Sequence, residues 1–167
     1  MVHRIAGERL SIAIDPWRSV LAAGSTVGAP AKEAVYGTSY RNYTGVTGND
    51  VAYYKDPFGI VHITGACEKT AAVLNNDTLL TLPVGYRPNQ SVQWMGMIGT
   101  QVSGAGLPGP SVSRMVILPW SDATKPGAVV LQGAGATNNP ATGAGFADAT
   151  LKDLLVVEIS FRVGGDL

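Results

Sequence analysis

The stretch Val51–Lys69, VAYYKDPFGIVHITGACEK, is the clearest structural signal in the chain. Two runs rich in β-branched and aromatic residues flank the segment Asp56–Gly59. Pro57 suits the second position of a type I turn, and Gly59 can adopt the left-handed conformation that follows such a turn. This pattern is typical of a β-hairpin that closes through a three-residue loop and a bulge.

The turn also predicts which residues of the hairpin lie opposite each other. Counting outward from it places Tyr54 opposite His62 and Tyr53 opposite Ile63. Successive side chains of a strand point to opposite faces, so the hairpin has one apolar face and one mixed face. We expect the apolar face to belong to the core, and it carries Val51, Tyr53, Val61 and Ile63.

Further strand-length runs follow the same alternation and are separated by segments rich in glycine and proline. We expect extended structure at residues 36–43, 79–82, 91–102, 112–118, 128–132 and 155–163. With the hairpin, this makes about eight strands at spacings of ~8–12 residues or more, and helix should account for less than about a tenth of the chain. The sequence therefore predicts an all-β fold, an antiparallel β-sandwich or a jelly-roll-like head domain.

Residues 1–34 differ from the rest of the chain, and we expect them to form a short N-terminal arm before a head domain at residues 35–167. The run Leu10–Ile14 could be a short strand. Trp17–Ala23 could form one or two helical turns, with Asp15 as the cap and Pro16 at the first helical position. Two interpretations of this arm stay open: it packs on its own domain, or it attaches to another protein.

The composition restricts the partners of the chain. Hydrophobic residues make up 46% of its 167 residues, charged residues make up 14%, and the formal net charge is +0. So few charges on so apolar a chain suggest that a partner covers part of the surface. Nucleic-acid binding is not expected, because it depends on neutralising phosphates with basic residues. Membrane insertion is not expected either, because no apolar run reaches the ~18 residues of a span.

The run Val112–Leu118 adds to this argument because its apolar residues fall on both faces. Val112, Val116 and Leu118 would share one face, and Met115 and Ile117 would lie on the other. Such a strand is either central in a two-layer core or buried by a neighbouring subunit.

The sequence offers little that points to catalysis. Cys67 is the single cysteine, so neither an intramolecular disulfide nor a cysteine-based zinc site is expected. His3 and His62 have no partner at metal-ligand spacing, and no nucleophile-elbow, phosphate-loop or calcium-loop motif occurs. We therefore expect no enzyme activity, no catalytic residues, no metal and no cofactor.

Three segments, in this order and spacing, resemble a known family. They are YYKDPFGIVHITG (Tyr53–Gly65), LTLPVGYRP (Leu80–Pro88) and LLVVEISFRV (Leu154–Val163). Together they resemble the C-terminal head domains of tailed-bacteriophage receptor-binding and tail-fibre proteins, and similar domains of baseplate proteins. The resemblance covers about residues 36–163, and the matching positions are those of the scaffold rather than of a binding site.

The resemblance implies a noncatalytic head, usually a homotrimer, that adsorbs the virion to a saccharide or protein on the host surface. The chain would then be made in the bacterial host cytoplasm and reside in the tail or baseplate. Residues 1–34 would contact other tail or baseplate proteins. Two alternatives stay open: a purely structural trimeric virion module without a receptor contact, and a carbohydrate-binding module of a bacterial protein.

Saccharide binding needs aromatic faces for stacking and polar side chains for the hydroxyl groups. Trp120 with Asp122, at the end of a strand, fits this description, although Trp120 could instead plug the end of the sandwich. Tyr54 and His62 would form a small platform on the outer face of the hairpin. They could equally face a sister subunit, which is the interpretation that the sequence favours.

A third candidate for receptor contact is the loop at residues 133–145, GAGATNNPATGAG. It has no large side chain to bury, so we expect it at the surface. Asn138 and Asn139 are its candidate binding residues.

Overall fold

Antiparallel strands make up the regular structure in the computed structural model, which describes residues 15–25, 33–43, 50–70, 76–101, 111–132 and 152–163. No helix occurs in these ranges, in agreement with the low helix content that the sequence predicts. The strands are β1 (Arg18–Ser19), β2 (Val35–Tyr36), β3 (Tyr40–Asn42), β4 (Ala52–Lys55), β5 (Ile60–Lys69), β6 (Thr78–Thr81), β7 (Val92–Gln101), β8 (Ser111–Ile117), β9 (Ala128–Gln132) and β10 (Lys152–Arg162).

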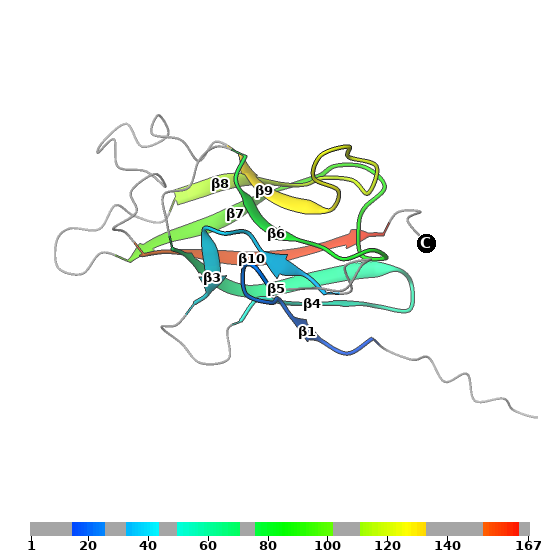
Figure 1. Cartoon of the computed structure of the whole chain (residues 1–167), viewed down its shortest axis with the longest axis horizontal. Helices are drawn as coiled ribbons and strands as arrows, with labels where there is room; N and C mark the ends of the chain where they lie inside the picture. The colour runs from blue at the N-terminus through cyan, green and yellow to red at the C-terminus, as the bar shows by residue number, and fades with distance from the viewer. Residues whose placement is uncertain are drawn as a thin grey trace, which may run out of the picture.

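These strands form a sandwich of two five-stranded antiparallel layers (Figure 1). The hydrogen-bonded order is β1-β4-β5-β10-β7-β8-β9-β6-β2, and β3 pairs with β5 outside this path. The layers meet where residues 152–156 of β10 pair with residues 97–101 of β7. The predicted all-β sandwich is therefore confirmed. The two strands beyond the eight expected are β1 and one more at residues 36–43, where β2 and β3 replace a single expected strand.

On the opposite side of the sandwich, a parallel β-bridge joins the described strands at the two ends of this path. Leu21, just after β1, pairs in parallel with Val35 of β2. The Leu21 N–H donates to the carbonyl of Ala34 at 2.8 Å, and the Tyr36 N–H donates to the carbonyl of Leu21 at 2.9 Å. The first and last strands of the path are thus linked by the chain segment that follows β1.

The hairpin of β4 and β5 has the predicted register. Tyr54 lies opposite His62, and Tyr53 lies opposite Ile63. The turn closes through the Asp56 N–H, which donates to the carbonyl of Ile60 at 2.8 Å. Gly59 has a φ of 77°, in the left-handed region that the turn requires.

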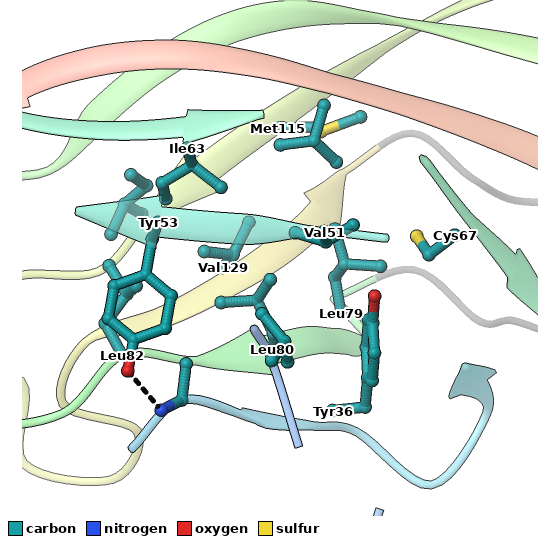
Figure 2. Packing of buried hydrophobic residues seen from close by; sticks show 14 of the residues in the cluster. Tyr36, Val51, Tyr53, Ile63, Cys67, Leu79, Leu80, Leu82, Met115 and Val129 are labelled. Carbon is teal, nitrogen blue, oxygen red and sulfur yellow. Dashed lines mark hydrogen bonds between the residues drawn. The ribbon is translucent and has the colours of Figure 1, made fainter. Parts of the chain in front are cut away.

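The core lies between the two layers, as Figure 2 shows. The predicted core face of the hairpin is fully buried, and Leu79, Leu80, Leu82 and Met115 from the other layer pack against it. The Tyr53 ring meets the Tyr86 ring edge-on at 5.2 Å between centroids. The Tyr53 hydroxyl accepts a hydrogen bond from the Ala34 N–H at 3.0 Å, so this buried polar group has a partner.

Strand β8 is apolar on both faces, as predicted, and its described side chains are covered within one chain. Met115 belongs to the main core, whereas Val116 forms a second buried cluster with Ala128 and Val130. Val116 is 3% exposed. The described part of this face, at Val116, therefore needs no neighbouring subunit to cover it, and the homotrimer stays a prediction that these residues do not support.

The N-terminal segment differs from the prediction. The expected helical turns at residues 17–23 are wrong: β1 lies there and pairs with β4, while Val20 enters the core. Ala34 is also a core residue, so the boundary at residue 34 does not separate the described part of the arm from the sandwich. The expected strand at Leu10–Ile14 lies outside the described residues. Pairing with β4 satisfies backbone groups that an isolated helical turn would leave unpaired.

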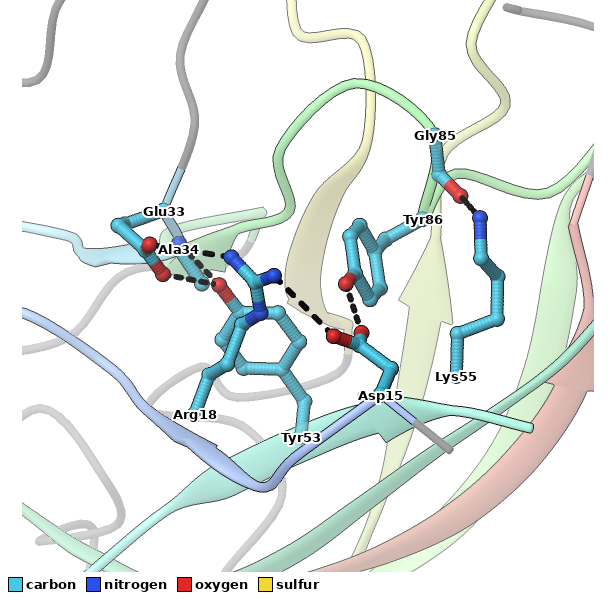
Figure 3. Close-up of polar contacts among 8 residues, drawn as sticks. All are labelled: Asp15, Arg18, Glu33, Ala34, Tyr53, Lys55, Gly85 and Tyr86. Carbon is cyan, nitrogen blue, oxygen red and sulfur yellow. Dashed lines mark hydrogen bonds and ion pairs between the residues drawn. The ribbon is translucent and has the colours of Figure 1, made fainter. Parts of the chain in front are cut away.

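A cluster of polar side chains, shown in Figure 3, connects the N-terminal segment around β1 to the rest of the sandwich. The Arg18 guanidinium pairs with carboxylates of Asp15 at 3.1 Å and Glu33 at 3.2 Å. The Tyr53 hydroxyl donates to Glu33 at 2.9 Å, and the Tyr86 hydroxyl donates to Asp15. Asp15 therefore accepts hydrogen bonds from the Arg18 guanidinium and the Tyr86 hydroxyl, and it does not cap a helix.

Candidate functional site

Four side chains form a line across the outer face of one layer, and we call Trp17, Tyr54, His62 and Ser160 the aromatic row. His62 lies opposite Tyr54 on one side and opposite Ser160 on the other. Arg18 pairs with Tyr53, which brings Trp17 beside Tyr54. Each strand contributes its outward position because the alternate residues are committed to the core.

The rings of the aromatic row contact one another. Tyr54 and His62 stack with 4.6 Å between ring centroids and 11° between ring planes. The Trp17 ring is tilted by 58° against Tyr54, with 4.4 Å between centroids. Trp17 is nevertheless 54% exposed, so most of this large apolar surface is available to a ligand.

An open groove of about 260 Å³ runs along the aromatic row. Besides the row itself, its polar lining consists of the exposed residues Thr64 and Glu158, which lie opposite each other on β5 and β10. Enclosed small-molecule pockets measure ~300–1,000 Å³. The groove is therefore smaller and more open than such a pocket.

Hydrogen bonds fix the His62 ring in place. Its Nδ1 lies 2.8 Å from the Ser160 Oγ, and its Nε2 lies 3.5 Å from the Asp56 Oδ2. Desolvation raises the pKa of Asp56, but hydrogen bonds from the N–H groups of Ile60 and Phe58 and from His62 lower the pKa more, so the net shift is downward. An ionised carboxylate can only accept, so the neutral imidazole carries its proton on Nε2, and Nδ1 is then the acceptor for the Ser160 hydroxyl.

The order Ser160–His62–Asp56 is that of a nucleophilic triad. Such a triad also needs N–H groups that point at the oxyanion. Ser160 lies within a β-strand, where backbone N–H groups lie in the plane of the sheet and point toward neighbouring strands. They do not point above the face, where the Ser160 Oγ lies. The hydrogen-bonded chain therefore orients the His62 ring and the Ser160 hydroxyl.

Trp120 and Asp122 have structural contacts of their own. The Trp120 Nε1–H donates to the Asn89 Oδ1 at 2.8 Å, and the side chain is 40% exposed. The Asp122 Oδ1 accepts from the N–H groups of Lys125 at 2.8 Å and Thr124 at 2.9 Å. These bonds lower the pKa of Asp122. Neither residue lines the groove, so their binding role stays a separate prediction.

The structure brings Tyr54 and His62 together as predicted, whereas Asn138 and Asn139 lie outside the described residues. The sequence did not predict that Trp17 belongs to this site, because Trp17 was expected in helical turns and not beside the hairpin. It also missed Ser160 and Glu158, although both belong to the alternating polar face of the last predicted strand. The alternation of polar and apolar residues could have identified both as outward-facing. It could not have shown that they lie beside His62, because that depends on the register of β10 against β5.

Comparisons with protein-family models, with curated proteins and with solved structures found no match to this chain. Within the described ranges, no three His, Cys, Asp or Glu side chains gather where they could hold a metal ion. The same ranges contain no helix of the length and apolar character needed to cross a membrane.

Proposed function

We propose that this chain is a receptor-binding head of a tailed-phage tail fibre or baseplate, and that it adsorbs to a host-surface saccharide through the aromatic row. The observation that carries this proposal is the exposed Trp17 beside the stacked Tyr54 and His62 rings, with Thr64 and Glu158 along the groove. Saccharides combine apolar ring faces with hydroxyl groups, so they suit a surface that offers aromatic faces next to polar side chains.

The three segments that resemble phage head domains support the proposal through their arrangement. The hairpin of β4 and β5 pairs with β10, and Lys55 in the hairpin donates to the carbonyl of Gly85 in the Pro83–Pro88 bend at 2.9 Å. The segments are thus parts of one scaffold, which is what the resemblance requires of them.

The proposal includes the remaining properties that the resemblance implies. The head is a homotrimer in the virion and is made in the host cytoplasm. Contact with other tail or baseplate proteins falls to the part of residues 1–34 that precedes Asp15, because Val20 and Ala34 belong to the core and Trp17 to the aromatic row. It acts without catalysis or a cofactor. Three weak sites on one trimer would bind a repetitive cell surface together, and such avidity can exceed the affinity of one site by ~10²–10⁴.

Adsorption of the purified protein to host cells tests this proposal. We expect Trp17→Ala to reduce adsorption at least about tenfold, because an aromatic anchor in a binding site contributes ~2 kcal/mol or more. Trp120→Ala is the matched control, since it removes another exposed tryptophan that lies outside the groove. Sedimentation of both variants shows whether the oligomer is intact.

The opposite pattern, with adsorption lost in Trp120→Ala and kept in Trp17→Ala, would move the site to the loop of Trp120 and Asp122. A Trp17→Ala protein that dissociates to monomers would instead make the aromatic row a subunit interface, which is the structural alternative.

A further inference from the structure

The aromatic row presents hydrogen-bond acceptors to the groove. In the neutral imidazole of His62 the Asp56 carboxylate keeps the ring proton on Nε2, and the Ser160 hydroxyl then donates its own proton to Nδ1. The free positions on the Ser160 Oγ are then lone pairs. A ligand group that meets Ser160 in this state has to donate a hydrogen bond.

Glu158 adds a carboxylate to the same side of the groove. It lies two residues before Ser160 on β10, so both side chains project from the same face. Glu158 lines the groove and is exposed, and no lysine or arginine is among the residues that line it. Arg162 continues this face of β10 but does not line the groove.

From this arrangement we infer that the groove accepts a saccharide that carries a protonated amino group, with the sugar ring on Trp17 and Tyr54 and the ammonium group between Glu158 and Ser160. The inference rests on the proposed function and adds the class of saccharide. An ammonium group supplies three donors and one positive charge, which matches one carboxylate and one hydroxyl acceptor. An acidic saccharide would meet like charge at Glu158 and no donor at Ser160.

Calorimetric titration at pH 7 tests the inference with three probes of equal length: a glucosamine trisaccharide, an N-acetylglucosamine trisaccharide and a galacturonic acid trisaccharide. We expect the glucosamine probe to bind at least about tenfold more tightly than the neutral probe, and the acidic probe to bind most weakly. Glu158→Gln should remove the preference between the first two probes. Arg162→Gln, on the same face of the same strand, should leave that preference in place.

Equal affinity for the amino and neutral probes, or tightest binding of the acidic probe, would overturn the inference and leave the proposed function standing. Loss of the preference in Arg162→Gln rather than Glu158→Gln would also overturn it. Absence of binding by all three probes would overturn the inference as well. The proposed function fails separately, when host adsorption does not depend on Trp17.

Discussion

Tyr54 and His62 lie directly opposite each other on β4 and β5, and their rings stack almost in parallel, 11° apart. The turn at Asp56–Gly59 sets the register of this pair, so a local sequence signal determines the geometry of the candidate site. Trp17 then extends the stacked pair across β1, and Ser160 extends it across β10.

The first prediction concerns the turn. Gly59→Val should lower the free energy of unfolding by at least about 1 kcal/mol, because a β-branched residue is strained at a φ of 77°. A side chain there would meet Val163 at 3.5 Å, an ordinary contact, so the cost comes from the backbone. Urea denaturation measures it. Phe58→Ala, which changes an exposed residue of the same turn, should leave stability unchanged; equal stability of all three proteins would refute the role of Gly59.

The second prediction concerns Gly65, in the middle of β5. Its φ is 129°, and an added Cβ would lie 2.4 Å from the carbonyl oxygen of Asp50 and 2.6 Å from the Cα of Val51. Gly65→Ala should therefore destabilise the fold by more than about 2 kcal/mol, since backbone atoms have to move. Thr64→Ala, on the exposed face of the same strand, serves as the control. Similar melting temperatures for the two variants would show that Gly65 is not needed.

The third prediction concerns stability at high pH. Desolvation and the hydrogen bond to Asp15 raise the pKa of Tyr86 to about 12, from an ordinary value of 10.0. A raised folded-state pKa gives a stabilising contribution that is complete below pH 10 and is lost as the pH rises through about 12. Tyr86→Phe lacks this titration and the hydrogen bond, so it should be less stable at pH 8, by about 1 kcal/mol.

Urea denaturation at several pH values between 8 and 12 would measure the difference between wild type and Tyr86→Phe. We expect that difference to shrink above pH 10. Burial also raises the pKa values of Tyr36, Tyr40 and Tyr53, but these titrations occur in both proteins and cancel in the difference. A constant difference over the whole pH range would contradict the Tyr86–Asp15 hydrogen bond.

The fourth prediction is the homotrimer. Exposed apolar side chains also occur at Val84 and Met95, and Met95 is 62% exposed on the outer face of β7. Such residues on a chain with 14% charged residues suit an interface between subunits. Sedimentation equilibrium should give three times the mass of 17.3 kDa. A stable monomer at micromolar concentration would remove both the interface and the avidity argument.

The sequence predicted the fold where local chemistry determines it. Asp56 and Gly59 define a turn, and the turn defines the hairpin register and its core face. The strand β1 could not be predicted in this way, because its two residues depend on pairing with β4 rather than on any propensity of their own. The same holds for the site: Ser160 and His62 are 98 residues apart, and their contact exists because β10 pairs with β5.

Nuclear magnetic resonance can locate a bound saccharide on the aromatic row through the tryptophan side chains. The chain has three tryptophans, at positions 17, 94 and 120, so its indole N–H region should contain three signals that Trp17→Ala and Trp120→Ala assign. During titration with the saccharide that binds most tightly, we predict that the Trp17 signal shifts and that the Trp120 signal does not. A shift of Trp120 with Trp17 unchanged would contradict the account.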